Sequence, residues 1–135
     1  MKTQNPIIAR FKKNPILTRK NVPYPVATVH KAGIVKHNDR YIMLFRSHLR
    51  NGRSIIGGAD SEDGFSFTVH PEPFLIPSTD NAFAEYEAFG VEDLRINPIE
   101  GEYLLTYSAY SRHGVRIALA RTSDFKKVER IALIT

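Results

Sequence analysis

Apolar residues alternate with polar ones, or form short β-branched runs, along most of the chain, and no stretch has the periodicity of a helix. Polar turns separate these segments, and the pair Asn51-Gly52 is typical of a β-hairpin turn. We therefore predict that residues 26–78 form a four-stranded antiparallel unit, preceded by an N-terminal strand at Asn14–Thr18. The predicted strands of the unit are Ala32–Lys36, Tyr41–Arg46, Arg53–Ala59 and Phe65–Val69.

The same order of strands and turns returns about 62 residues later, as in a repeat architecture. Arg40–Ser47 aligns with Glu102–Ala109, which predicts a second unit in residues 88–135. The same offset places Gly52 on Gly114, Ile55 on Ile117 and Ser61 on Ser123, and one extra residue then brings Asp63 near Asp124. The predicted strands are Leu94–Ile96, Tyr103–Ala109, Val115–Arg121 and Lys127–Leu133.

Four short antiparallel strands per repeat are typical of the blades of a β-propeller. We therefore predict an all-β fold in which residues 1–135 form a single partial propeller domain of about two four-stranded blades. A small β-sandwich is the alternative architecture. Because two blades cannot close a ring, we expect either a piece of a longer protein or a homo-oligomer.

The composition of the chain mainly excludes classes of protein and kinds of site chemistry. The chain has no cysteine, so disulfides and thiolate chemistry are excluded. No apolar run approaches membrane-spanning length, and Pro6–Ala9 is too short for the core of a signal peptide, so we expect a soluble, cytoplasmic protein without a membrane partner. The net charge of +5 fits a solvated basic surface, an anionic substrate or a nucleic acid. Scattered basic residues without a binding motif argue against nucleic acid, and the five histidines lack metal-ligand spacing, so we predict no metal.

Acidic residues gather immediately before one predicted strand, in the run Gly90-Val91-Glu92-Asp93-Leu94-Arg95. Clustered carboxylates repel one another, and their burial raises the pKa of each. Such a cluster therefore suggests a site that transfers a proton or binds a polyol. The repeat places Lys31 at the point equivalent to Asp93, so both residues should lie just before an inner strand and face the propeller axis.

Three segments of the chain, Gly90–Ile96, Glu100–Ser111 and Arg116–Ala120, resemble glycoside hydrolase family 130, with a further match at Ser61–Phe67. This family comprises five-bladed propellers that include β-mannoside phosphorylases. The resemblance implies that the chain is part of a five-bladed ring acting on β-mannosides or related oligosaccharides. It implies cleavage with inversion, in which inorganic phosphate is the nucleophile and co-substrate; hydrolysis is the variant, and no other cofactor is expected. The family's usual proline after the aspartate is Leu94 here.

The resemblance assigns the proton donor to Asp93, whose proton would reach the leaving oxygen through a sugar hydroxyl. Asp93 can be that acid if enclosure or the neighbouring Glu92 raises its pKa. Guanidinium groups suit the binding of phosphate, which makes arginines the candidate anion ligands. The remaining predicted site residues are Arg46, Arg95, Lys31 and Tyr110 for substrate and Arg46 and Arg53 for phosphate.

Each of these residues also has a plainer interpretation. Asp93 and Arg95, two apart on a strand, would share a face and could form a structural ion pair. Arg46 and Lys31 could simply reach solvent, Tyr110 could be packing, and Glu92 would point away from Asp93 and bond to a loop. For the whole chain, the alternative function is a non-catalytic β module that binds carbohydrate or mediates assembly.

Overall fold

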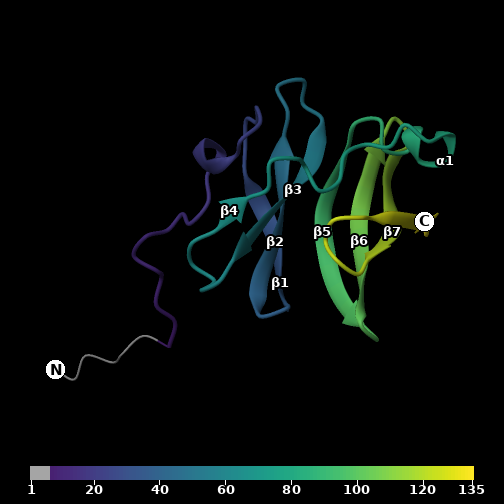
Figure 1. The fold of residues 1–135 in the computed structure, drawn as a ribbon. Coiled ribbons are helices and arrows are strands. Elements are labelled where there is room, and N and C mark those ends of the chain that lie inside the picture. The colour runs from purple at the N-terminus through teal and green to yellow at the C-terminus, as the bar shows by residue number, and fades with distance from the viewer. Residues whose placement is uncertain (1–6) are drawn as a thin grey trace.

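The structure is a computed structural model that describes residues 7–135, and most of it is β-sheet (Figure 1). The strands are β1 (His30–His37), β2 (Arg40–His48), β3 (Ser54–Ser61), β4 (Thr68–Val69), β5 (Gly90–Ile99), β6 (Glu102–Ser111), β7 (Gly114–Thr122) and β8 (Glu129–Leu133). The helical elements are a short 3₁₀ turn, η1 (Arg19–Asn21), and a single α-helical turn, α1 (Asn81–Ala84). Neither helix in the described residues is long and apolar enough to cross a membrane.

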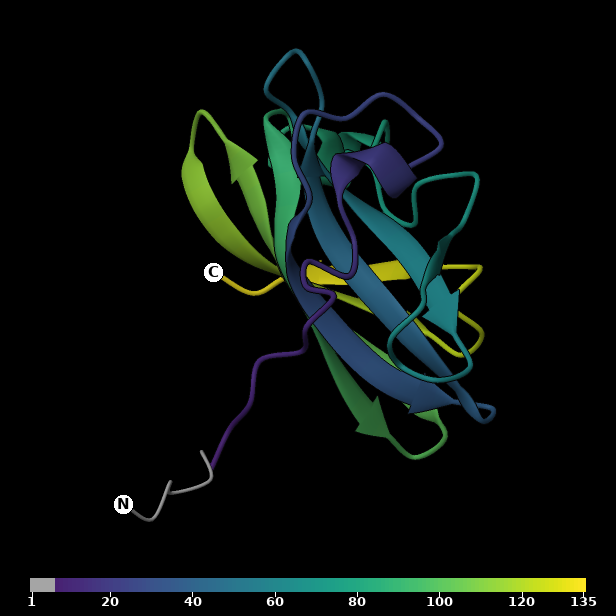
Figure 2. The same cartoon turned by 90° about the vertical axis from the view of Figure 1, so that its left-hand side faces the viewer.

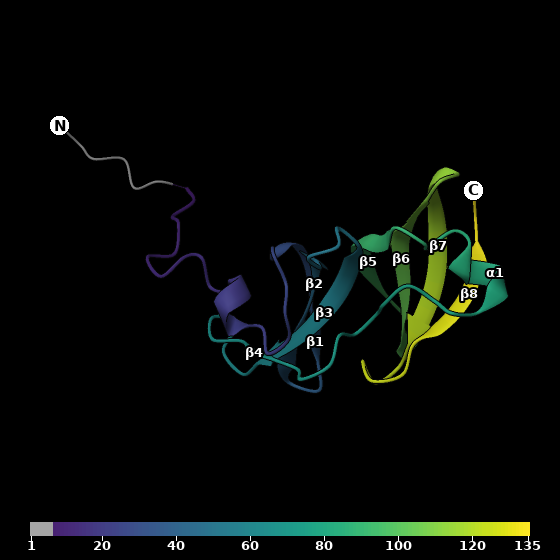
Figure 3. The same cartoon turned by 90° about the horizontal axis from the view of Figure 1, so that it is seen from above.

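The strands form two antiparallel units, β1–β4 and β5–β8, which lie side by side when seen from above (Figure 3). One parallel contact, between Ser54 and Gly90, joins β3 to β5. Gly90 has a φ of 146°, and a Cβ there would lie 2.6 Å from the Ser54 nitrogen. Only glycine therefore allows this approach of the two units. The two predicted four-stranded blades are confirmed.

The predicted N-terminal strand at Asn14–Thr18 is wrong. The Thr18 side chain accepts a hydrogen bond from the Lys20 N–H, while the Asn21 side chain accepts one from the Thr18 N–H, so this segment leads into η1 as a capping box. Leu17 and Val22 are buried against Met43 and Phe45 of β2. The N-terminal segment with η1 thus covers the outer face of the first blade as irregular chain (Figure 2).

The outermost strand of the first blade is shorter than predicted, because β4 contains only Thr68 and Val69. The Asp63 carboxylate accepts the N–H groups of Phe65 and Ser66, which keeps these residues in the turn. The helical turn α1 had no sequence signal, since one turn is too short to show periodicity. Its start is capped by the Asp80 carboxylate, which accepts the Ala82 N–H at 2.9 Å.

The two blades pack face to face through one apolar core. It is formed by alternate residues of β2, β3, β5, β6 and β7, including Leu44, Ile56, Val91, Leu105 and Tyr107. These side chains are nearly inaccessible to solvent. The alternation of apolar and polar residues in the sequence therefore identifies the side chains that face the core.

The repeat is visible in the backbone, with one shift relative to the sequence alignment. The loop between β6 and β7 is one residue shorter than that between β2 and β3, because Tyr110 pairs with Val115 where His48 pairs with Ser54. Beyond this loop the offset is 61, so Ser61 corresponds to Thr122 rather than to Ser123. Likewise, Ile117 corresponds to Ile56, not to Ile55. The Ser61 and Thr122 hydroxyls each donate a hydrogen bond to the aspartate two residues later in the chain, in matching turns.

A buried carboxylate joins the connection between the blades to strands β6 and β8 of the second blade. Glu87 is inaccessible to solvent. It accepts hydrogen bonds from the Tyr107 hydroxyl at 2.6 Å, from the Ser78 N–H at 2.7 Å and from the Arg130 guanidinium at 2.7 and 2.9 Å. Burial and the hydrogen bond to the Glu87 carboxylate raise the pKa of Tyr107. The positive charge of Arg130 compensates the buried charge of Glu87 and so offsets the cost of its burial.

Replacing Arg130 by methionine should lower the free energy of unfolding by about 3 kcal/mol, because it leaves the buried Glu87 charge without its partner. Urea denaturation of the full chain measures this loss. The matched control is Arg121→Met, which breaks an exposed pair with Glu129, the neighbour of Arg130 on β8, and should lower the free energy of unfolding far less, because an exposed ion pair contributes little. Equal losses for the two variants would contradict the assignment of Glu87 and Arg130 as a structural pair.

Candidate active site

Asp93 lies in a β-bulge of the inner strand β5. The pairing with β6 shifts register between Glu92 and Arg95, and Asp93 has a φ of 51°. Lys31 occupies the matching bulge of β1, with a φ of 48°. The two side chains meet, with Lys31 Nζ 3.0 Å from Asp93 Oδ2. The equivalence of these residues, predicted from the repeat, is therefore also a direct contact between the two inner strands.

Arg46, near the end of β2, reaches across the blade interface to both acids. Its Nη1 donates to Asp93 Oδ1 at 3.1 Å, and its Nη2 donates to Glu92 Oε1 at 2.7 Å. Ser54 Oγ donates to the same Glu92 oxygen at 2.7 Å. The Arg46 side chain is only 15% exposed, so this is a largely enclosed charge cluster and not a solvated surface cation.

Burial alone would raise the pKa of Asp93, but the hydrogen bonds from Lys31 and Arg46 outweigh it and hold this pKa below its usual value. The condition set for Asp93 as an acid, a pKa raised by enclosure or by Glu92, is therefore not met with both cations in place. The reason is that both cations come from the other blade, while Glu92 is itself neutralised by Arg46.

The bulge also overturns two orientations expected from strand alternation. Glu92 does not point away from Asp93, since both carboxylates converge on Arg46. Within residues 7–135 no ion pair joins Asp93 to Arg95, so the structural pair considered for them is wrong. Arg95 instead helps to line an open hollow of about 320 Å³ together with Lys31 and Asp93. The hollow gives a ligand access to the Asp93 carboxylate.

Two predicted ligands lie outside this cluster. Arg53 is exposed at the turn before β3, where its N–H donates to Asn51 Oδ1. Tyr110 is 40% exposed and packs edge-to-face on Phe89, with ring centroids 5.4 Å apart. The structure therefore brings together Asp93, Arg46 and Lys31, with Arg95 at the rim, but not Arg53 or Tyr110.

The sequence prediction missed His48, Thr28 and Ser54. His48 Nε2 lies 3.1 Å from Arg46 Nη2, and its Nδ1 lies 3.0 Å from Thr28 Oγ1. The only available signal was that His48 follows Arg46 by two residues and so shares its strand face. In the described part of the chain, no group of three His, Cys, Asp or Glu side chains is arranged to hold a metal ion.

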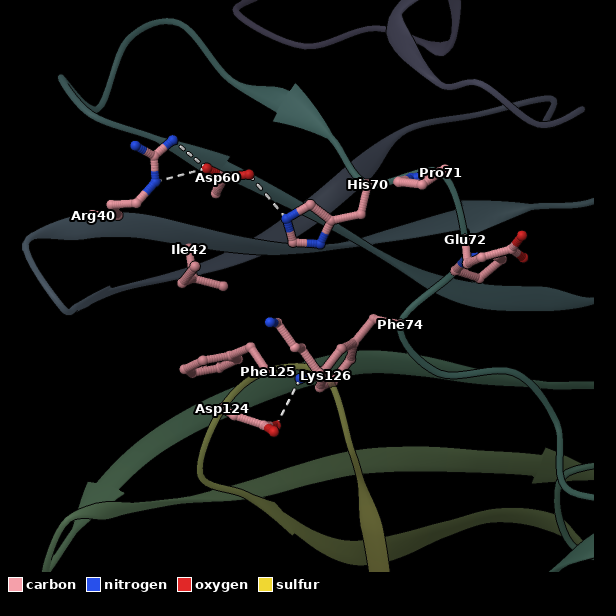
Figure 4. A pocket seen from close by; sticks show the side chains of 11 residues that line it. Arg40, Ile42, Asp60, His70, Pro71, Glu72, Phe74, Asp124, Phe125 and Lys126 are labelled. Atoms are coloured by element: carbon pink, nitrogen blue, oxygen red, sulfur yellow. Dashed lines mark hydrogen bonds and ion pairs between the residues drawn. The ribbon is translucent and has the colours of Figure 1, made fainter.

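A second hollow, of about 430 Å³, lies between the blades at the opposite end of β2 and β3 (Figure 4). Its floor is apolar, with Ile42, Phe74 and Phe125, and its main polar groups already pair with one another. Asp60 accepts from the Arg40 guanidinium and lies 3.0 Å from His70 Nε2. These groups lie far along the strands from Asp93, so this hollow is no part of the carboxylate site.

Comparisons with known proteins identify the family. The family model described as beta-1,4-mannooligosaccharide phosphorylase matches residues 2–134. The chain therefore belongs to glycoside hydrolase family 130, and its strands form about two blades of that family's five-bladed propeller.

Individual relatives agree with this assignment. The beta-1,2-mannobiose phosphorylase of Listeria innocua is 43% identical over 76 residues, which cover 56% of this chain and 20% of that protein. The structure of the Listeria innocua beta-1,2-mannobiose phosphorylase with beta-1,2-mannobiose superposes with a TM-score of 0.74 at 25% identity, covering 90% of this chain and 49% of that one. A glycosyl hydrolase from Bacteroides ovatus gives 0.71 at 27% identity, covering 76% and 30%. The chain thus spans a fifth of the curated relative and less than half of these structures.

Replacing Lys31 by methionine should raise the pKa of Asp93, because one of the two cations that stabilise its carboxylate is removed. The protonated form of Asp93 would then persist to higher pH than in the unaltered protein. The ¹³C chemical shift of the Asp93 carboxyl carbon, followed against pH, measures the change.

The control is Lys36→Met, on the same strand but over the Tyr41 ring, which should leave the Asp93 titration unchanged. An Asp93 titration that stays in place, or moves to lower pH, in Lys31→Met would show that the ion pair does not set this pKa.

Proposed function

We propose that the chain carries the proton donor of a β-mannoside phosphorylase, with Asp93 as that donor and inorganic phosphate as the nucleophile. The observation that carries the proposal is the position of Asp93. Its carboxylate lies on the inner strand of its blade, beside an open hollow, between Lys31 and Arg46. Membership of the family supports the reaction class, and the relatives' names support mannosides as the substrate class.

The reaction needs a proton for the leaving oxygen and a nucleophile on the opposite face of the sugar. A phosphate oxygen forms the new bond to the anomeric carbon as the bond from that carbon to the leaving oxygen breaks. The proton leaves the Asp93 carboxyl and reaches the leaving oxygen through a sugar hydroxyl. Phosphate arrives as an anion, so no second carboxylate has to act as a base.

The lowered pKa of Asp93 has a place in this scheme. An anion that binds to Lys31 and Arg46 competes with Asp93 for both cations, which weakens their hold on the carboxylate and favours its protonation. After proton transfer, the same two cations stabilise the carboxylate that remains. Phosphate is favoured over water as the nucleophile because a largely enclosed arginine and an exposed lysine side by side suit a dianion.

We further propose that Arg95 contacts the sugar at the rim of the hollow, and that Tyr110 and Arg53 contribute to the binding of sugar and of phosphate from a greater distance.

We also propose that the protein works in the cytoplasm and forms a homo-oligomer. Assembly is supported by side chains on β7 and β8 that remain exposed, including Val115, Ile117 and Ile131. Exposed apolar groups of this kind mark a surface that another sheet can cover.

Incubation with β-mannobiose and phosphate should release mannose 1-phosphate, and Asp93→Asn should slow the release by at least about 10²-fold, since an amide cannot supply the proton. Circular dichroism checks that the variant keeps its sheets. Turnover by Asp93→Asn at the normal rate would refute the assignment of the donor. Sugar binding without turnover in either protein would favour the non-catalytic carbohydrate-binding module instead.

A further inference from the structure

His48 touches the candidate site without a role in the chemistry proposed for it. The residue ends β2, two positions after Arg46, on the same face of the strand. Its ring bridges the Arg46 guanidinium and Thr28, at 3.1 and 3.0 Å. The ring of His30, on β1, stacks against it with centroids 5.2 Å apart. The imidazole is thus fixed on two nitrogens and one face.

Its partners allow only one protonation state. A guanidinium has no acceptor, so Arg46 Nη2 must donate to His48 Nε2, which has to carry a lone pair. The hydrogen must then reside on Nδ1, which donates to Thr28 Oγ1. That oxygen also accepts the backbone N–H of His48 at 3.0 Å. The contacts fit the neutral imidazole with hydrogen on Nδ1 and exclude the other tautomer and the cation.

We propose that His48, as the neutral Nδ1–H tautomer, is a positioning residue for Arg46. Among residues 7–135, its Nε2 is the one uncharged acceptor on the guanidinium, whose other contacts are the carboxylates of Glu92 and Asp93. Without that acceptor, only the two carboxylates hold the Arg46 guanidinium. The guanidinium then turns toward the carboxylates and away from the bound anion. The inference rests on the proposed function in that the anion bound by Arg46 is phosphate.

Charged and titratable groups surround His48 on three strands. The positive charge of Arg46 lies within hydrogen-bonding distance of its ring. Burial, and after it the charge of Arg46, lower the pKa of the stacked His30. The charged or titratable groups around His48 are His30 and Lys31 on β1, Arg46 on β2, and Glu92 and Asp93 on β5.

The unaltered protein tests the tautomer directly. Long-range ¹H–¹⁵N correlation spectra of the full chain at pH 8 should show His48 with a protonated Nδ1 and an unprotonated Nε2. A hydrogen on Nε2 would overturn the proposal, because Arg46 could then not donate to that atom.

Two substitutions separate the acceptor from the bulk of the ring. In His48→Gln the amide oxygen can occupy the place of Nε2 and accept from Arg46, whereas His48→Leu has similar bulk and no acceptor. Phosphate affinity, measured by calorimetry at pH 8, should change less than about twofold in His48→Gln. It should fall by about three- to tenfold in His48→Leu, as for one lost hydrogen bond. His70→Gln and His70→Leu, at the opposite end of the blade, should both leave phosphate affinity unchanged.

Equal losses in His48→Gln and His48→Leu would overturn the positioning role. If phosphate binds to none of the proteins, the proposed phosphate site fails, and the Arg46 side-chain ¹⁵N signals decide the question about His48. Signals that broaden in His48→Leu but stay sharp in His48→Gln would support positioning. Signals that are the same in both variants would refute it.

Discussion

The site depends on a single feature of the backbone, the bulge that places Asp93 in the left-handed region. In a regular strand, successive side chains point to opposite faces, so Glu92 and Asp93 could not reach the same arginine. The bulge breaks this alternation and directs both carboxylates to Arg46. Positive φ is uncommon for residues other than glycine. Here it occurs at both Lys31 and Asp93, whose ion pair holds the two bulges against each other.

The contacts that form the site also join the blades. Arg46 comes from β2, while Glu92 and Asp93 come from β5, and the apolar interface of Leu44 and Val91 lies between the same strands. Removing one partner of an enclosed ion pair leaves an uncompensated charge and destabilises the fold. Changes to Arg46 therefore affect the proposed phosphate site and the blade packing together. Lys31 is different, because its side chain is 59% exposed and its charge can be removed at little cost to the fold.

Repeated patterns in the sequence predicted the strands, but no pattern predicted which charged residues from distant parts of the chain form contacts. Strand alternation and the repeat were enough to predict the eight strands, the two blades and the equivalence of Lys31 and Asp93. They could not predict the bulge, which depends on pairing with the neighbouring strand and leaves no mark in the alternation. On a strand without the bulge, Arg95 would share a face with Asp93 and could pair with it. The sequence also could not show that the pKa of Asp93 is lowered, because both cations that lower it come from the other blade.

The two hollows show why charge alone does not mark a binding site. In the hollow of Figure 4, Arg40, Asp60 and His70 satisfy one another within one blade, so a ligand would have to break contacts that already neutralise its partners. At Asp93 the exposed Lys31 can turn toward an incoming anion, and Arg46 can release Asp93 while it keeps Glu92 as a counter-ion. Both cations can thus exchange Asp93 for the anion, and Asp93 becomes neutral when it takes up a proton. This capacity for exchange, more than the size of either hollow, makes the Asp93 cluster the better site for the proposed anionic co-substrate.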